Sequence, residues 1–354
     1  PKIAARLAAA QASLGHQAVM ACRNEPEIQP VVDEELRSIP SSDKVEYSPA
    51  TNIEDLLGRC DFLHLHSLWS PICRTAAAAA RKRNVPYTIL LNGMLDPYSL
   101  AQKKWKKKVA LLLGYRAMLN HAAFLHTGNA DEVRLIEPLR LAPPCRTIPN
   151  GVFLEELLPL PPAGSFYAKH PEVDRQPFIL FLARLHHKKG LDYLADAFKF
   201  TAAKMPDVRL VVAGPDGGAR QMFVDRIASA GLLARVHVVG PLYHRDRLDA
   251  MADASCFCLP SRQEGFSLAI TEALGCGLPV VISQNCHFPE VADFGAGLVL
   301  PLEAPALAEG LLSVLGDPGL RERMSRAGSK MIRERYTWPV IARQTIDAYN
   351  EFLR

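Results

Sequence analysis

The sequence contains no run of 18 apolar residues, so it predicts no transmembrane helix. It also contains no C-x-x-C pair: the eight cysteines are scattered, and several lie in apolar runs typical of strands. A reduced, cytoplasmic protein with buried thiols is therefore favoured over a disulfide framework or a zinc site. A large excess of one charge is absent as well. The net charge of +4 suits an anionic small ligand or a membrane surface and requires neither.

A strand followed by a glycine-rich turn is missing from the start of the chain. The sequence begins at Pro1, its first recognisable element is a helix over residues 3–14, and a strand over residues 17–22 follows. An α/β domain of this kind usually opens with a strand and a glycine-rich turn before its first helix. We therefore expect that the true N-terminus lies outside this sequence, and a signal peptide can be argued neither for nor against.

What the sequence does contain is two series of alternating strands and helices. With 354 residues, of which 49% are apolar, the chain is long enough for two domains. Between the series, the stretch Pro161-Pro162-Ala163-Gly164-Ser165 has no hydrophobic period and is typical of a linker. The sequence thus predicts an α/β protein with two doubly wound domains. Its expected parts are a first domain over 1–157, a linker over 158–177, a second domain over 178–335 and a last helix over 336–354.

One polar loop stands between two apolar runs of the second series. The runs over residues 256–259 and 280–282 predict buried parallel strands, and the stretch between them predicts a loop that leads into a short helix. Ligands of such sheets bind beyond the carboxyl ends of the strands, where this loop is expected. The loop carries Glu264, and the helix carries Glu272 eight positions later. Gly265 lets the backbone approach a ligand closely, and unpaired N–H groups follow at the helix start.

Two cations, Arg184 and Lys189, are expected at the same end of the sheet. They lie in the loop that follows the first strand of the second domain. Two cations near a helix N-terminus favour an anion, and a diphosphate matches that charge. Taken alone, the stretch could equally be a solvated basic loop, but its expected place beside the Glu264 loop favours an anion site.

The two glutamates suit a different part of such a ligand. A carboxylate placed against a diphosphate is repelled unless a metal bridges them. Glu264 and Glu272 are therefore better suited to accept hydrogen bonds from sugar hydroxyls: Glu272 from a ribose diol and Glu264 from a second, transferred sugar. The amides of Phe266, Ser267 and Leu268 would then face the phosphates. The simpler alternative is that both acids only complement the helix dipole.

At this point the sequence resembles a known family. The spacing of Glu264 and Glu272 is the E-x7-E pattern of the retaining family 4 (group 1) glycosyltransferases. The resemblance covers nearly the whole chain. It is carried in addition by Pro260-Ser261, Glu272-Ala273-Leu274-Gly275-Cys276-Gly277-Leu278-Pro279-Val280-Val281, Arg184 with Lys189-Gly190, Val212-Ala213-Gly214-Pro215-Asp216, Ile148-Pro149-Asn150-Gly151-Val152 and Tyr336-Thr337-Trp338.

The resemblance implies the GT-B fold, in which two Rossmann-like domains face each other across a cleft and the last helix crosses back to the N-terminal domain. It implies transfer, with retention, from a nucleoside diphosphate sugar to a hydroxyl of a glycan or lipid-linked acceptor, in polysaccharide or glycolipid assembly. The C-terminal domain is expected to hold the donor and the N-terminal domain the acceptor. The residues implied are Glu264, Arg184, Lys189 and His66 for catalysis, and Gly265, Phe266, Ser267, Leu268, Glu272, Gly214 and Asn150 for donor binding.

The expected chemistry uses no cofactor and no protein nucleophile. The family's implied route is a front-face substitution, in which the leaving phosphate helps to deprotonate the acceptor hydroxyl. Arg184, Lys189 and the helix start would stabilise the charge that develops on the departing diphosphate. The sequence contains no D-x-D motif, so we expect no essential metal ion.

The N-terminal motifs resemble the family less closely. Of the two histidines in His64-Leu65-His66, the second lies nearer the loop and is the expected site residue, with Trp69 after it. Asn92 stands before Gly93 where the family often has His or Arg. In the family, an acid usually follows the motif Asn150-Gly151-Val152, and here Phe153 occupies that position. We assign Asn92 and Trp69 to the acceptor side. These departures keep open a non-catalytic scaffold subunit that binds sugar nucleotides, and a sugar-nucleotide epimerase is a more remote alternative.

A further stretch concerns the surface. Five lysines surround a tryptophan at the start of a helix expected over residues 104–120. Such a stretch could lie on an anionic membrane face and place the protein at the periphery of the inner membrane face, or it could be a solvated helix surface. Nucleic-acid binding is disfavoured, because the rest of the chain offers no extended basic stripe. The residues are Lys103, Lys104, Trp105, Lys106, Lys107 and Lys108.

Overall fold

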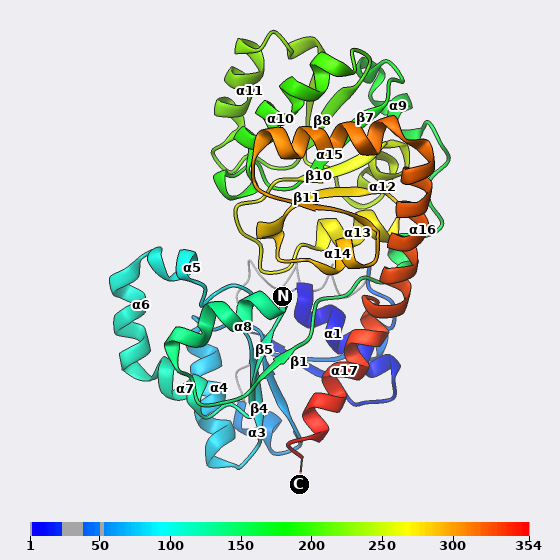
Figure 1. Cartoon of the computed structure of the whole chain (residues 1–354). Coiled ribbons are helices and arrows are strands. Elements are labelled where there is room, and N and C mark those ends of the chain that lie inside the picture. Colours follow the sequence, from blue (N-terminus) through cyan, green and yellow to red (C-terminus); the bar gives the residue numbers. More distant parts are fainter. Residues whose placement is uncertain (1, 23–37, 50–52, 354) are drawn as a thin grey trace. The chain divides into compact units, whose positions relative to one another are not determined.

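The computed structural model of the chain describes residues 2–22, 38–49 and 53–353. The chain forms two units, which are considered separately below (Figure 1). The first comprises residues Pro1–Phe153 and Thr337–Arg354, and the second comprises Leu154–Tyr336. The chain therefore leaves the first unit once and returns to it with its last helix, as expected for the GT-B fold.

The second unit contains a six-stranded sheet in the order β12-β11-β10-β7-β8-β9, and all of its strand pairs are parallel. The strand order reverses between β7 and β10, the arrangement in which open α/β sheets bind ligands at the carboxyl ends of the strands. The strands are β7 (Phe178–Leu182), β8 (Arg209–Ala213), β9 (Val236–Gly240), β10 (Cys256–Leu259), β11 (Val280–Ser283) and β12 (Gly297–Leu300).

Helices cover this sheet, and its strands β10 and β11 are buried along their whole length. Every residue of β10 and β11 is buried, which is why these strands have continuous apolar runs rather than an alternating pattern. The helices are α10 (Leu191–Lys204), α11 (Arg220–Ser229), α12 (His244–Asp253), α13 (Leu268–Gly275), α14 (Glu290–Asp293), α15 (Ala304–Gly316) and α16 (Pro318–Arg335).

The segment 158–177, which we expected to be a linker, is built into the second unit. It contains α9 (Ser165–Lys169) and the 3-10 turn η5 (Pro171–Val173). The Phe166 ring is buried and lies 5.2 Å from the Phe178 ring. The backbone N–H groups of Gly164 and Phe166 both donate to the Asp253 carboxylate at the end of α12. Prolines hide the hydrophobic period of this segment, and a single buried aromatic anchors it.

The first unit contains a four-stranded parallel sheet in the order β3-β4-β5-β6 and a separate parallel pair of β1 and β2. The strands are β1 (Val19–Cys22), β2 (Glu46–Pro49), β3 (Leu63–Leu65), β4 (Tyr87–Leu90), β5 (Phe124–Thr127) and β6 (Cys145–Thr147). The main helices are α1 (Lys2–Ser13), α3 (Ile53–Leu57), α4 (Pro71–Lys82), α5 (Pro97–Ala101), α6 (Lys104–Ala110), α7 (Arg116–Asn120), α8 (Ala130–Ile136) and α17 (Trp338–Asn350).

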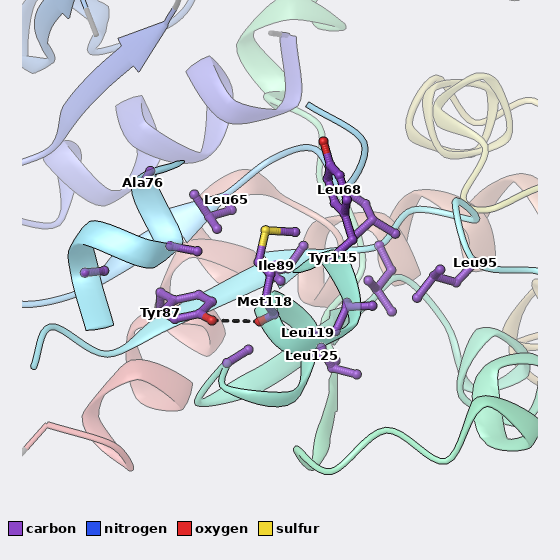
Figure 2. Packing of buried hydrophobic residues seen from close by; sticks show 14 of the residues in the cluster. Leu65, Leu68, Ala76, Tyr87, Ile89, Leu95, Tyr115, Met118, Leu119 and Leu125 are labelled. Carbon is purple, nitrogen blue, oxygen red and sulfur yellow. Dashed lines mark hydrogen bonds between the residues drawn. The ribbon is translucent and has the colours of Figure 1, made fainter. Parts of the chain in front are cut away.

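Two hydrophobic cores hold this unit. Figure 2 shows the first, in which Leu65, Tyr87 and Ile89 of the strands pack with Met118 and Leu119 of α7, and the Tyr87 hydroxyl donates to the Met118 carbonyl oxygen at 2.7 Å. The second core contains α1, α17 and Phe124. The last helix is therefore a covering layer of the first unit, and the expected return of this helix to the N-terminal domain is confirmed.

The return of the chain requires a glycine. The Trp338 N–H donates to the Val152 carbonyl oxygen at 3.0 Å, and Val152 forms a parallel bridge with Thr337. A Cβ atom on Gly151 would lie 2.8 Å from the Trp338 nitrogen, too close for any side chain. The neighbouring Phe153, which stands where the family usually has an acid, is buried in the same core.

The helix expected over residues 104–120 is interrupted, so the prediction of one continuous helix is wrong. It consists of α6, a π-helical turn η2 (Leu111–Tyr115) and α7. Gly114 has φ 107°, a left-handed conformation that an α-helix does not contain. The apolar period continues across this glycine, which is why the sequence pattern alone did not reveal the break.

Candidate functional site

The loops that follow β7 and β10 lie against each other in the second unit. The Arg262 N–H donates to the Lys188 carbonyl oxygen at 2.7 Å. Gly190, which ends the first loop, has φ 69°, and a Cβ atom there would lie 1.8 Å from the Pro260 carbonyl oxygen. Only glycine permits this approach. The reversal of strand order between β7 and β10 thus brings the basic loop and the Glu264 loop together, as the sequence predicted.

An ion pair joins the two loops at the centre of the site. Lys189 Nζ lies 2.6 Å from Glu264 Oε1, and the Ser261 hydroxyl donates to the same oxygen at 2.5 Å. The Glu264 side chain is 8% exposed and the Lys189 side chain 19%. Within the described part of the chain, both side-chain hydrogen bonds to Glu264 use Oε1. The second oxygen, Oε2, is left for another donor.

Further pairs fix the two loops. The Arg262 guanidinium donates to both carboxylate oxygens of Asp192, at 2.8 and 2.5 Å, and lies over the Tyr193 ring. Lys188 Nζ donates to Gln263 Oε1 at 2.8 Å. Two-point contacts of this kind hold a guanidinium and a carboxylate in one geometry. The backbone that leads into Glu264 is therefore held firmly.

Glu272 lies in α13 and is paired with Arg247 of α12, at 3.0 Å between Oε2 and Nε. Both side chains are about one-fifth exposed. The sequence pattern pointed to Glu272 but not to Arg247, because nothing in the sequence shows that α12 places a cation beside α13. The cation beside Glu272 could therefore not be predicted from the sequence. The sequence pattern likewise assigns no separate role to Ser261, whose hydroxyl contacts Glu264.

Arg184 lies in the loop after β7 with an exposed side chain, and it forms no ion pair with any residue the structure describes. Its neighbours are the glycines that follow β8. A Cβ atom on Gly217 would lie 3.0 Å from Arg184 Cγ, and one on Gly214 would lie 1.9 Å from the Ala183 carbonyl oxygen. Gly214 therefore lets the loop after β8 pack against the loop that carries Arg184.

The helix α13 begins at Leu268, four positions after Glu264. Ser267 occupies the N-cap position, but its side chain makes no capping hydrogen bond. Among the described residues no side chain caps the first turn, around Leu268, so its N–H groups remain available to an anion. Just before it, Phe266 packs against Phe288 and Tyr336, at ring distances of 5.5 and 6.2 Å. The aromatic contact anchors the loop, in which Gly265 links Glu264 to Phe266.

In the first unit, the candidate His66 belongs to a cluster of three histidines on β3 and β5 and just after β3. His66 follows β3, and its ring stacks on that of His64 at 4.2 Å. His126, which the sequence pattern did not single out, lies 3.1 Å from His64 between ring nitrogens. His66 Nδ1 is buried without a hydrogen-bond partner among the described residues. Burial, with a further contribution from His126, lowers the pKa of His66 to about 3, so its ring is neutral.

Asn92 has a backbone reason for its identity. It is exposed and has φ 44°, a left-handed conformation that asparagine adopts more readily than arginine. The next N–H, of Gly93, donates to the buried Glu132 carboxylate, which also accepts from Gly128 N–H at 2.7 Å. The loop is therefore attached to the start of α8. Replacement of the family's cation by Asn92 fits the shape of this turn.

Trp69 and Asn150 complete the candidate set. The Trp69 ring is 5.7 Å from the Tyr115 ring and 5.5 Å from Lys107 Nζ, and its Nε1 is buried without a described partner. Asn150 lies beyond β6 and is 4% exposed. His66, Trp69, Asn92 and Asn150 belong to the first unit, whereas all the other candidates belong to the second.

Two negative findings concern the described residues. No group of three or more His, Cys, Asp or Glu side chains there is arranged to hold a metal ion. Nor is any helix in that part both long and apolar enough to cross a membrane.

Comparison with known proteins covers both units. The family model for glycosyl transferases group 1 matches residues 165–331, and the model for the glycosyl transferase 4-like domain matches residues 2–151. A phosphatidyl-myo-inositol mannosyltransferase of Mycobacterium tuberculosis is 32% identical over 214 residues, which are 57% of this chain and 53% of that protein. A D-inositol 3-phosphate glycosyltransferase of Jonesia denitrificans is 27% identical over 82% of this chain and 72% of its own.

The chain thus spans about half the length of the first of these curated relatives. Solved structures resemble nearly all of it. Sucrose-phosphate synthase of Thermosynechococcus elongatus has a TM-score of 0.72 at 20% identity, covering 98% of this chain and 92% of that one. Anabaena HepE, solved in complex with UDP, has a TM-score of 0.77 at 19% identity, covering 98% and 96%. These structures show that the fold is GT-B.

Proposed function

The chain belongs to the group 1 glycosyltransferases, and we propose that it transfers a sugar from a nucleoside diphosphate sugar to a hydroxyl of a glycan or lipid-linked acceptor. The observation that carries the proposal is the pair of Lys189 and Glu264 beside the start of α13. A cation, a carboxylate and uncapped amides meet there at the carboxyl end of a parallel sheet. A sugar diphosphate combines the anionic groups and hydroxyls that this set would bind.

The donor's diphosphate would bind to Lys189, Arg184 and the amides at the start of α13. An ammonium group has three N–H donors, and Glu264 accepts only one of those of Lys189. Arg184 is exposed and forms no ion pair within the described chain, so its guanidinium remains able to meet phosphate oxygens. Each charge-assisted hydrogen bond contributes about 1.5–3 kcal/mol. These groups would also stabilise the charge that develops on the departing diphosphate.

The two glutamates would bind hydroxyls. Glu264 Oε2 accepts no side-chain hydrogen bond within the described residues and would accept one from the transferred sugar. Glu272 would accept from a ribose diol while Arg247 holds its carboxylate in place. Lys189 lies beside Glu264 and so offsets the repulsion between that carboxylate and a bound diphosphate.

Retention of the anomeric configuration is part of the proposal. His66, kept neutral by burial, would hydrogen-bond the reacting sugar rather than act as a cation. We assign no carboxylate nucleophile, and the leaving phosphate would accept the acceptor proton. The anomeric configuration of the product, read by proton NMR, tests retention. Full activity in the presence of a chelator would support the absence of a metal requirement, and loss of activity would contradict it.

The decisive experiment measures release of the nucleoside diphosphate. A thermal-shift screen of nucleotide sugars would first identify the donor, because a ligand that binds only the folded state raises its stability. Turnover with that donor and a membrane or glycan extract should then depend on Glu264, Lys189 and Arg184. Donor binding without transfer to any acceptor would favour the scaffold alternative. Near-normal turnover in folded Glu264→Ala and Lys189→Ala variants would refute the site.

We further propose that the protein acts at the periphery of the inner membrane face, where a lipid-linked acceptor would lie. Four large apolar side chains on α6 and η2 are strongly exposed: Trp105 at 76%, Val109 at 49%, Leu112 at 78% and Leu113 at 65%. Trp105 and Val109 are four positions apart on one face of α6, and Leu112 and Leu113 follow on the π-helical turn η2. Together they offer an apolar edge to a lipid surface.

Charge supports the same partner. Residues 97–130 contain no Asp or Glu, so the lysines of this segment meet no local acid. Lys103, Lys104, Lys106 and Lys108 are exposed, and Lys108 lies 5.5 Å above the Trp105 ring. Lys107 differs from them, because its amino group donates to the Ser99 carbonyl oxygen at 2.5 Å. Four lysines, rather than the five expected, therefore remain for an anionic surface, at about 1 kcal/mol each.

Vesicle flotation tests this partner. The protein should float with vesicles that contain anionic lipid and much less with purely zwitterionic ones. Replacing Trp105 and Leu112 by serine, or three exposed lysines by glutamate, should abolish binding. Phe200→Ser is the matched control, because it removes a half-exposed aromatic from α10 of the second unit. Binding that survives both sets of changes would show that this face is only a solvated helix surface.

A further inference from the structure

A chain of hydrogen bonds runs through the first unit from α1 to the end of β6. Gln11 Nε2 donates to the Tyr349 hydroxyl at 3.2 Å, and that hydroxyl lies 2.6 Å from His64 Nδ1. His64 Nε2 lies 3.1 Å from His126 Nδ1, and His126 Nε2 lies 2.7 Å from the Ile148 carbonyl oxygen. The chain crosses α1, α17, β3, β5 and the segment after β6.

The strand register explains how the histidines meet. His64 is paired with Thr88 on β4, and Thr88 is paired with Phe124 on β5. Residues paired in this way point to the same face of a parallel sheet, and so do residues two positions apart. His64, His66 and His126 therefore share one face. It is the face of Phe124, which packs in the core formed with α1 and α17.

The proton positions along the chain follow from its last acceptor. A carbonyl oxygen only accepts, so His126 Nε2 carries a hydrogen. Burial lowers the pKa of His126 to about 4 and that of His64 well below its usual value, so both rings are neutral. His126 Nδ1 then accepts from His64 Nε2–H. His64 Nδ1 in turn accepts from the Tyr349 O–H, whose oxygen accepts the Gln11 N–H.

The chain of hydrogen bonds supports the ring of His66. Its ring lies on the His64 ring at 4.2 Å with an angle of 26° between their planes. Hydrogen bonds at both nitrogens of His64 prevent that ring from turning. We propose that Tyr349, His64 and His126 are positioning residues that fix the ring of His66 for the sugar transfer, an inference that rests on the proposed function. No step of the transfer needs a proton from them.

The arrangement gives the last helix a task beyond packing. The Tyr349 ring stacks on Phe62 at 4.2 Å, a contact that needs no hydroxyl. Among the described residues, its hydroxyl contacts only Gln11 and His64 of the hydrogen-bond chain. Removal of this hydroxyl therefore separates the two roles. The helix that returns to the first unit after residue 336 thereby supports the ring of a candidate catalytic residue.

The test compares Tyr349→Phe with Tyr87→Phe, each made in the whole 354-residue chain. Tyr87 is the matched control, because its buried hydroxyl donates to the Met118 carbonyl oxygen at 2.7 Å in the other core of the same unit. Nitrogen-15 histidine NMR reads the tautomers, and His64→Gln and His126→Gln variants assign the signals. In the wild type, both His64 and His126 should be Nε2–H tautomers at pH 7.

Tyr349→Phe should shift and broaden the ring signals of His64 and His66, and should lower kcat about tenfold with an unchanged donor KM. Tyr87→Phe should change neither. If His64 or His126 of the wild type were found in the Nδ1–H or the doubly protonated form, the proposed chain of hydrogen bonds would be wrong. Unchanged His66 signals or unchanged kcat in Tyr349→Phe would overturn its positioning role. A wild type that transfers no sugar would refute the proposed function. The NMR signals would still test the chain of hydrogen bonds in that case.

Discussion

In the second unit, Glu264 and Lys189 form an ion pair at 2.6 Å, whereas in the first unit two neutral histidines are joined by a 3.1 Å hydrogen bond. The charged pair joins two neighbouring loops and is partly open to solvent. The histidine pair lies on a strand face under two helices. A mobile, highly charged diphosphate needs fixed charges near solvent, whereas an imidazole that must stay neutral is kept so by burial.

The ion pair of the second unit is tested most directly by a substitution at Glu264. Glu264→Gln keeps an acceptor for the Ser261 hydroxyl but removes the charge that faces Lys189. We expect kcat/KM to fall roughly 100-fold, the equivalent of one charge-assisted interaction lost in the transition state. Initial rates of nucleoside diphosphate release measure the effect. Glu309→Gln, an exposed change on α15, is the control and should leave the rate unchanged.

The closeness of the two loops can be tested separately from charge. Gly190→Ala places a Cβ atom 1.8 Å from the Pro260 carbonyl oxygen, so the loops must move apart. Gly231→Ala is matched to it, because Gly231 has φ 70° against 69° for Gly190 but open space around its Cβ position. Both variants bear the left-handed strain of about 1–2 kcal/mol.

The difference between the two glycine variants isolates the clash. We expect Gly190→Ala to be less stable than Gly231→Ala by at least about 2 kcal/mol, and to lose donor binding as well. Urea unfolding and the thermal shift with the identified donor measure the two effects. Equal stability of the variants would mean that the loops are not held together at this point.

The neutral side of the comparison predicts a dependence on pH. The folded pKa of His126 is about 4, below its unfolded value of about 6.5, so the unfolded chain binds the proton first on acidification. The stability from this group is therefore complete above about pH 6.5 and is lost as the pH falls toward 4. The loss amounts to about 2 kcal/mol between pH 7 and 4.5.

Urea unfolding at several pH values checks this slope. His126→Gln retains one donor and one acceptor but does not titrate, so its stability should fall less steeply between pH 6.5 and 4.5. The acids of the chain titrate in both proteins, so the difference between the two slopes reports the titration of His126 together with its electrostatic effect on His64 and His66. Identical slopes would show that His126 is not a neutral residue in the folded chain.

The difference between the two units also explains which features could be predicted from the sequence. The GT-B fold and the meeting of Glu264 with Lys189 depend on short-range patterns, because each residue follows its strand within a few positions and parallel topology aligns the strand ends. The two partners that were missed, Arg247 and His126, each depend on the packing of separate elements. Their positions carry no local sign of a site, since Arg247 lies in an ordinary polar helix and His126 in an apolar strand.

Two other outcomes have the same cause. The break at Gly114 was missed because a glycine inside an apolar helical period is compatible with a continuous helix. The role of Tyr349 was missed because it depends on contacts with Gln11 and His64, separated from it by 338 and 285 positions. Contacts over such distances follow from sheet register and helix docking, which one sequence does not reveal.

The smallest expected effect concerns Glu272, and it compares the two glutamates of the second unit with each other. Glu264 is 8% exposed and Glu272 about one-fifth, and Glu272 would bind only the nucleoside part of the donor. Glu272→Gln should therefore raise the donor KM about tenfold and leave kcat nearly unchanged, because its contact is equal in the ground state and the transition state. Arg247→Lys keeps a cation beside Glu272 and should raise KM less. If Glu272→Gln instead lowered kcat as strongly as Glu264→Gln, the two glutamates would share one role, and the separation of transferred sugar from ribose would fail.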